Sequence, residues 1–356
     1  MKFRVFVAAV ALIAAAPAAH AQFEGEIAEP SQGPWDPNYE PPRLENGQPS
    51  FEGVWTNASL TVLERATRNF ALLGMNPDEV GLVLPDEKAA QIAKQVEMMR
   101  ASGNRPTDPN EGVPQAGGDP GGYNTFWMDF GTGLARIDGQ FRTSWIVDPE
   151  DGKLPWSEEG RQRMEERRAV IQQPDNPETR TAGERCTVGF GSTGVPPMLN
   201  VLYNNHYEFA QDDDVVAIVV EMNHQARMIR LNDEHRPPEM RQWLGDSIGE
   251  WEGDTLVVHT TNGHPQNVYR GAIRHQIMVS PDAEVTERFT RVSDNEIFYE
   301  WTLVDPVHYT QPVKGEMVFL KAEGPIFEYA CHEGNYSMPG ILAGARREER
   351  LAAEAE

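Results

Sequence analysis

Chemically active side chains are concentrated near the end of the chain, in residues 328–336. This segment holds a thiol, an imidazole, two carboxylates, an amide and two phenols: Glu328, Tyr329, Cys331, His332, Glu333, Asn335 and Tyr336. Because the apolar residues 324–327 come directly before it, we expect a strand over 326–331 that ends in a polar turn. A strand end holds polar side chains rigidly and leaves them open to a ligand. The segment therefore predicts a functional site.

His332 and Glu333 are the strongest acid–base candidates in this segment. Imidazole titrates near neutral pH, and a neighbouring carboxylate can orient it. Such a pair moves protons without a dissociable cofactor, as elimination, hydration and isomerisation require. The alternative is a structural histidine that caps a strand end or binds a backbone carbonyl.

Two more clusters combine a carboxylate with an imidazole. Asp233 and His235 precede two consecutive prolines, where they could face the mouth of a cavity. Asp305 and His308 form the other cluster. Each cluster also fits a solvated turn, so the residue types alone leave catalysis and structure open.

Two charged residues within apolar segments need partners if they are buried. Glu221 ends an apolar strand, and we expect it to pair with Arg227 or Arg230 across a hairpin; the alternative is a catalytic acid. Arg142 lies in an aromatic segment, where it binds either the carboxylate of a ligand or an acidic side chain of the protein.

Aromatic residues on one face of a strand predict a lining for a small apolar or aromatic ligand. Because side chains alternate along a strand, Tyr299 and Trp301 share one face of residues 297–304. An aromatic interior with few polar groups is typical of a barrel that binds one small molecule. The candidate ligand-binding residues are Trp127, Arg142, Tyr299, Trp301, Tyr329, Asn335 and Tyr336.

The two cysteines of the chain, Cys186 and Cys331, are expected to form a disulfide in an oxidising compartment. The alternatives are a buried pair of inert thiols and a nucleophilic Cys331 beside His332. Metal binding is not expected, because the chain contains no His-x-His, His-Glu-x-x-His or Cys-x-x-Cys motif. We identify no Rossmann or Walker glycine pattern either, so we expect no nucleotide cofactor.

The N-terminus has the features of a cleaved secretory signal over residues 1–21. Lys2 and Arg4 precede an apolar run over 5–16, and Ala19-His20-Ala21 supplies small residues at the cleavage site. The apolar run is too short to span a bilayer, and no cysteine follows the cleavage site to carry a lipid. We therefore expect a periplasmic protein without a membrane anchor.

The net charge narrows the choice of partners. The chain carries a formal charge of −24, which repels nucleic acids and anionic membrane surfaces. Neither is expected as a partner. Hydrophobic residues make up 39% of the chain, enough for a sizeable core at this length.

Hydrophobic periodicity predicts a mainly β protein with an antiparallel, lipocalin-like barrel over residues 186–345. A Pro-rich extended arm (22–50) and N-terminal strands with a helical elaboration (51–185) precede the barrel, and a charged tail (346–356) follows it. The expected barrel strands are 213–222, 226–231, 255–261, 285–292, 297–304, 316–322 and 326–331. Before them we expect helices over 87–101 and 158–173, the second capped by Ser157, and strands over 123–129 and 141–147.

Two sequence blocks resemble the hallmarks of a widespread family of secreted bacterial proteins without an assigned function. They are Gly-Asp-Ser-Ile-Gly-Glu-Trp-Glu-Gly-Asp-Thr-Leu-Val-Val at 245–258, and residues 328–346 with Tyr-Ser-Met-Pro-Gly-Ile-Leu-Ala-Gly-Ala at 336–345. Residues 53–60, 142–144 and the pair Asp148-Pro149 also resemble that family. The resemblance implies export and a mainly β fold, and it implies no mechanism.

Two functions follow from these patterns. The first is a cofactor-independent lyase, hydratase or isomerase in which His332 and a nearby carboxylate move protons on an apolar or aromatic molecule, such as a plant-derived aromatic dimer. The second is a periplasmic binding or carrier protein that holds a hydrophobic small molecule without catalysis. A carrier would tolerate His332→Ala, whereas an enzyme would lose turnover.

Overall fold

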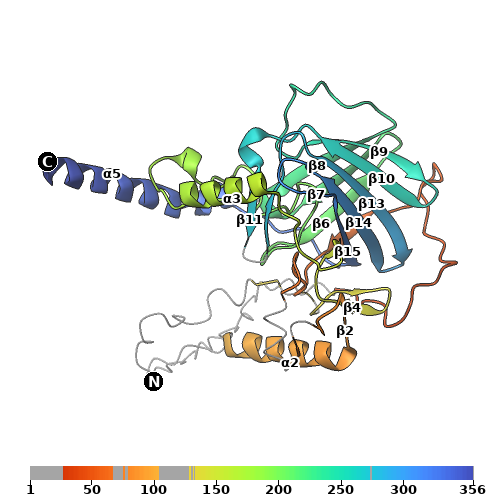
Figure 1. Cartoon of the computed structure of the whole chain (residues 1–356). Coiled ribbons are helices and arrows are strands. Elements are labelled where there is room, and N and C mark those ends of the chain that lie inside the picture. Colours follow the sequence, from red (N-terminus) through yellow and green to blue (C-terminus); the bar gives the residue numbers. More distant parts are fainter. Residues whose placement is uncertain are drawn as a thin grey trace, which may run out of the picture.

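The computed structural model describes residues 27–66, 75–76, 79–103, 128–129, 131, 133–272 and 275–355. Across these residues the chain is mainly β, with a closed nine-stranded barrel and a few helices outside it (Figure 1). The predicted signal peptide lies outside the described residues, as does most of the strand predicted over 123–129. None of the described helices is long and apolar enough to cross a membrane.

The barrel confirms the fold class predicted from the sequence. Its strands are β1 (Gly53–Thr56), β6 (His206–Gln211), β7 (Val215–Val220), β8 (Gln225–Leu231), β9 (Asp246–Glu252), β10 (Thr255–Thr261), β13 (Glu284–Ser293), β14 (Glu296–Val304) and β15 (Val313–Lys321). They pair in this order, and β15 pairs back with β1 to close the barrel. All neighbours are antiparallel except β8 and β9, which run parallel, so residues 232–245 must cross back between them.

Smaller elements surround the barrel. The strands are β2 (Val83–Leu84), β3 (Arg136–Ile137), β4 (Gln140–Arg142), β5 (Ile146–Asp148), β11 (Tyr269–Ala272) and β12 (His275–Met278). The helices are α2 (Asp86–Gly103), α3 (Glu158–Ile171), α4 (Cys331–Gly334) and α5 (Ser337–Ala355), with 3₁₀ turns at Pro177–Thr179, Met222–His224 and Pro265–Asn267. The predicted helices over 87–101 and 158–173 are confirmed as α2 and α3.

Aromatic side chains fill the barrel interior. Tyr299 packs on Phe289 with ring centroids 4.8 Å apart and on Phe319 at 5.5 Å. Tyr207 meets Phe319 from another strand at 5.2 Å. The alternation predicted for β14 is therefore correct, with Tyr299 and Trp301 both buried. Because these rings pack against one another, the inward aromatic residues form a core.

Residues 187–201 form an irregular segment that packs on this core. The Met198 N–H donates to the Tyr299 hydroxyl at 2.9 Å. The prediction that the sequence holds no Rossmann glycine pattern is wrong, because residues 189–194 (Gly-Phe-Gly-Ser-Thr-Gly) have the spacing of a dinucleotide-binding glycine loop. No helix follows this run, so it is not the start of a Rossmann unit. A Cβ at Gly191 would lie 2.5 Å from His275 Nε2, and its φ is +64°. Close packing and backbone conformation therefore account for this glycine.

The strand predicted over 326–331 is wrong. Residues 323–330 form no helix or strand, and α4 begins at Cys331. The Phe327 N–H donates to Glu221 Oε1 at 3.2 Å, and its carbonyl accepts from His224 Nε2 at 3.0 Å. Side chains, rather than a neighbouring strand, thus satisfy the backbone here.

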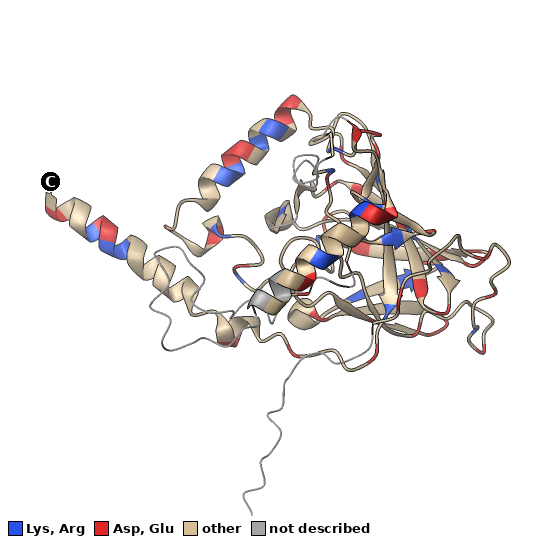
Figure 2. Ribbon diagram, turned by 90° about the horizontal axis from the view of Figure 1, so that it is seen from below, with Lys and Arg blue, Asp and Glu red and all other residues tan. Residues whose placement is uncertain are grey.

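The predicted charged tail belongs to a long helix. Helix α5 begins at Ser337 and runs away from the barrel toward the C-terminus (Figure 1). Pro339 fits its first turn, where a missing N–H costs no hydrogen bond. Figure 2 shows acidic and basic residues interleaved along α5, and Ala345 is its buried residue.

The single strand predicted over 141–147 is two strands, β4 and β5. Between them the Thr143 N–H donates to the Leu82 carbonyl and the Trp145 N–H to the Val62 carbonyl, each at 2.9 Å. The chain therefore changes partners within this aromatic segment, and β5 pairs with Lys314 and Gly315 at the start of β15.

Candidate functional site

The predicted pair His332 and Glu333 lies on the surface. Both residues are exposed on α4, and within the described part of the chain neither side chain makes a hydrogen bond or an ion pair. Tyr336 is 84% exposed. Asn335 instead donates to the Glu184 carbonyl at 2.8 Å, which docks α4 on residues 181–186. His332 therefore has no carboxylate to orient it.

The predicted disulfide is present. Cys186 and Cys331 are bonded at an S–S distance of 2.03 Å. Neither sulfur is a thiol in this structure, so the nucleophilic role considered for Cys331 has no free group to carry it. Tyr329, two residues earlier, packs on the barrel core, and burial raises the pKa of its hydroxyl.

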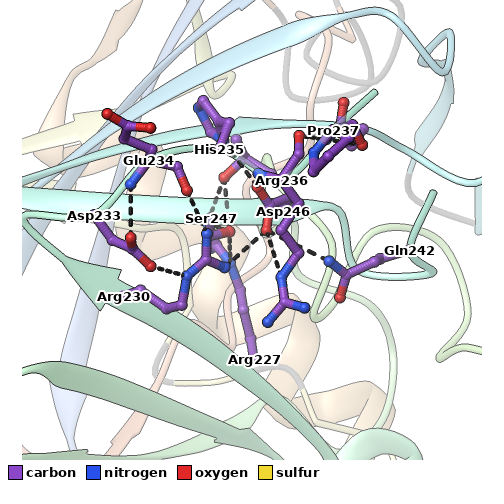
Figure 3. Close-up of polar contacts among 12 residues, drawn as sticks. Arg227, Arg230, Asp233, Glu234, His235, Arg236, Pro237, Gln242, Asp246 and Ser247 are labelled. Atoms are coloured by element: carbon purple, nitrogen blue, oxygen red, sulfur yellow. Dashed lines mark hydrogen bonds and ion pairs between the residues drawn. The ribbon is translucent and has the colours of Figure 1, made fainter. Parts of the chain in front are cut away.

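The second predicted cluster is organised by a residue that the sequence analysis did not single out, Asp246 at the start of β9 (Figure 3). Its side chain is fully buried. His235 Nδ1 lies 3.0 Å from Asp246 Oδ2, and the Arg236 N–H donates to the same oxygen at 2.8 Å. Arg230 Nη1 donates to Oδ1 at 2.8 Å. We name Asp246, His235, Arg230 and Arg236 the Asp246 cluster.

The Asp246 cluster keeps its carboxylate ionised. Burial alone would raise the pKa of Asp246, but hydrogen bonds from Arg230, the Arg236 N–H and His235 lower it below its ordinary value. An ionised carboxylate only accepts hydrogen bonds, so His235 Nδ1 carries the proton. His235 Nε2 is the ring nitrogen that does not contact Asp246, on a side chain that is 31% exposed.

Asp233 and His235 were predicted to lie together at the mouth of a cavity, and in the structure they bind different partners. Asp233 instead binds Arg230 Nε from the outer side, and Arg230 Nη2 donates to the Glu234 carbonyl at 2.8 Å. The predicted residues are brought together, but Asp246 takes the orienting role. The sequence feature that could have identified Asp246 is an acidic residue at the first position of a strand, next to the inward Ser247.

The Asp246 cluster also has a structural role. Strands β8 and β9 are parallel, and Ile229 pairs with Ser247 in their register. Residues 232–240 between them are exposed, so few apolar contacts hold this crossover. Asp246 fastens it through the backbone of Arg236 and the side chains of Arg230 and His235.

The other two predicted acidic groups are structural pairs. Asp305 Oδ2 lies 2.7 Å from His308 Nδ1, and both side chains are fully buried. Burial opposes ionisation of Asp305, yet bonds from His308 and the Ser280 N–H lower its pKa. The predicted pairing of Glu221 with an arginine is wrong, because Glu221 lies 3.0 Å from His206 Nδ1. The two residues face each other across the antiparallel β6–β7 hairpin end.

The remaining predicted ligand-binding residues contact protein groups. Arg142 pairs with Glu316 at 3.1 Å. The Tyr299 hydroxyl donates to Glu287 at 2.7 Å, and Trp301 is 1% exposed. Trp127 lies outside the described residues. These three described side chains are therefore largely buried, and Arg142 is the most exposed of them at 10%.

An open cavity of about 390 Å³ lies outside the barrel, between α3 and β12. Helix α3 lines it with Arg161, Met164, Glu165 and Arg168, which share one face at i, i+3, i+4 and i+7. We name this space the α3 cleft. The charged helix lies where the sequence predicts it, but the sequence gives no role to this face.

No family model and no curated protein matches the chain. Within the described residues, no group of three histidine, cysteine or acidic side chains could hold a metal ion.

Proposed function

We propose that this chain is an exported, periplasmic enzyme that moves protons on a small apolar or aromatic molecule without a dissociable cofactor, as a lyase, hydratase or isomerase. The observation that carries the proposal is the contact of His235 Nδ1 with the buried Asp246 at 3.0 Å. It fixes the ring and leaves Nε2 toward solvent as the base. The resemblance to a family of secreted proteins agrees with export.

In this proposal His235 Nε2 takes a proton from the substrate and returns it to the leaving group or to a second carbon. Arg236 is the group that stabilises the negative charge developing on the substrate. Its side chain is 47% exposed, and its Nε lies 3.5 Å from Asp246, so it is held beside His235. The exposed Met240 and the two prolines 237–238 offer an apolar surface nearby.

The second candidate function is a binding or carrier protein without catalysis. The α3 cleft favours it, because its cavity is open while aromatic rings fill the barrel. A carrier would bind its ligand in the cleft and would not require an acid–base group at His235.

The experiment incubates the oxidised protein with aromatic dimers, terpenoids and sterols and follows new masses by chromatography. His235→Gln and Asp246→Asn should each lower turnover about 100-fold or more, as expected for loss of a general base. His259→Gln is the control, because His259 is an exposed histidine on β10 whose recorded bond is to Thr286.

His332→Gln separates the two predicted sites. If His332→Gln abolishes turnover while His235→Gln does not, the acid–base site lies on α4 and our assignment is wrong. If the native protein and every variant bind the compounds and release them unchanged, the carrier function replaces the enzyme.

A further inference from the structure

The side chains that line the α3 cleft carry equal numbers of acidic and basic groups. Opposite helix α3, it is lined by Glu64, Trp156, His275 and Gln276. Together with α3, this gives two arginines and two glutamates, so the acidic and basic side chains cancel. The net charge of the lining is therefore close to zero, which favours neither an anionic nor a cationic ligand.

The polar groups of the cleft are suited to hydroxyl groups. Carboxylate, guanidinium and amide groups are planar and present two hydrogen-bonding atoms side by side. Glu165 and Arg161 can each therefore hold a pair of neighbouring hydroxyls. Gln276 offers its amide NH2 as a donor, since its Oε1 accepts from Arg168. A neutral molecule with many hydroxyls satisfies such a set without leaving a charge unpaired.

One aromatic ring lies among these polar groups. Trp156 is half-buried and packs on Tyr309, with ring centroids 5.0 Å apart. The backbones of the same two residues form a β-bridge, so the ring is held on a rigid support. A flat apolar ring in a polar cleft matches a ligand with one apolar face and a polar edge.

The cleft continues into a second cavity of about 370 Å³. The two cavities share Arg168 and Gln276, which are joined by a bond from Arg168 Nε to Gln276 Oε1 at 3.1 Å. Tyr269 lines the second cavity. The combined space is elongated along α3 and has two compartments.

We infer that the α3 cleft binds a neutral carbohydrate or glycoside of two units, one in each compartment, with the first ring on Trp156. This site is separate from the Asp246 cluster and does not depend on the proposed acid–base function. It assigns a role to the exposed charged face of α3 that barrel stability does not require.

Isothermal titration calorimetry tests this inference with cellobiose, maltose, trehalose and sucrose, and with benzoate and phosphate as charged probes. We expect saturable binding of at least one disaccharide and none of the anions. Glu165→Gln and Arg161→Gln should each weaken that binding about tenfold, as loss of a hydrogen bond to a charged group predicts.

Matched controls lie on the same helix. Glu166→Gln and Arg163→Gln make the same changes of charge at exposed positions outside the cleft, where Arg163 pairs with Glu159. Both should bind the disaccharide as the native protein does. Circular dichroism of all four variants would verify that α3 is intact.

Three outcomes would overturn the inference: no saturable binding of any disaccharide, equal loss in Glu165→Gln and Glu166→Gln, or benzoate or phosphate binding that Arg161→Gln removes. His235→Gln should leave sugar binding unchanged. Failure of the sugar site and failure of the acid–base site are thus observed in different variants.

Discussion

Asp246 explains why His235, of the predicted catalytic histidines, has a defined orientation. The carboxylate is buried and receives donors from one histidine and two arginines. His332 has a carboxylate beside it in sequence, but both side chains are exposed on α4. Adjacency along the chain does not orient an imidazole, whereas a buried acceptor does.

Asp246→Asn should lower the free energy of unfolding by about 3 kcal/mol at neutral pH, because it leaves buried donors without their charged acceptor. The pKa of Asp246 is below its ordinary 3.8, so its ionised form stabilises the fold. That contribution is present above pH 4 and is lost as the pH falls through the lowered value. Urea unfolding of both proteins between pH 3 and pH 7 measures it.

Asp233→Asn is the control for this prediction. Asp233 binds the same Arg230 from the solvent side, and its side chain is 52% exposed. Its replacement should change the unfolding midpoint little. A difference between native protein and Asp246→Asn that grows toward pH 3 would contradict the assigned sign.

The residue types of the site were predictable, but their partners were not. His235 was identified from its sequence neighbours, and the structure gives it Asp246, 11 positions away. The parallel register of β8 and β9 brings Arg230 opposite Ile248 and so close to Asp246. Strand periodicity cannot supply that information, because it fixes the face of a side chain and not its neighbour in the next strand.

At the level of elements, local signals were sufficient where the chain caps its own helices. Ser157 was predicted to begin α3, and its hydroxyl accepts from the Gly160 N–H at 2.8 Å. The same hydroxyl donates to the Val307 carbonyl at 2.9 Å. The cap therefore also ties α3 to the segment that holds Asp305 and His308.

Ser157→Ala should lower the free energy of unfolding by about 1 kcal/mol, the usual cost of losing an N-cap. Thermal unfolding followed by circular dichroism measures the shift. Ser157→Asp restores the acceptor but cannot donate to Val307, so it should recover part of the loss. Equal stability of the native protein and Ser157→Ala would contradict a capping role.

Local signals failed at the C-terminal segment. Residues 326–331 have the composition of a strand, yet Glu221 and His224 bind the backbone of Phe327 and the disulfide fixes Cys331. These are contacts across more than 100 positions. Long-range side-chain hydrogen bonds and the disulfide hold this segment in place of the strand pairing that its composition predicts.

Replacing both cysteines by serine should lower the free energy of unfolding by about 4 kcal/mol in the chain-entropy model. The disulfide closes a loop of 145 positions, which constrains the unfolded chain strongly. Urea unfolding of the double variant beside the oxidised native protein measures the loss. A dithiothreitol-treated native protein should match the double variant, and a mismatch would point to the substitutions themselves.

At the scale of the whole molecule, the barrel is a packed core with one charged pair at its centre. Arg227 binds Glu287 through both carboxylate oxygens, and the two side chains are 1% and 0% exposed. Their polar neighbours are Ser247, Thr260 and Tyr299. Strand alternation predicts the inward position of Glu287, since Val285 and Phe289 flank it, but composition predicts an outward glutamate.

Glu287→Gln should destabilise the protein by about 3–5 kcal/mol, because it leaves the buried Arg227 charge without its partner. The double variant Arg227→Met with Glu287→Leu removes both charges and should recover most of that loss, since apart from three hydroxyl groups the surrounding core is apolar. A double-mutant cycle by urea unfolding gives the coupling energy. If the double variant is as unstable as the single one, the hydroxyls of Ser247, Thr260 and Tyr299 require the charged pair as their hydrogen-bond partner. The barrel would then depend on the charged network for its stability.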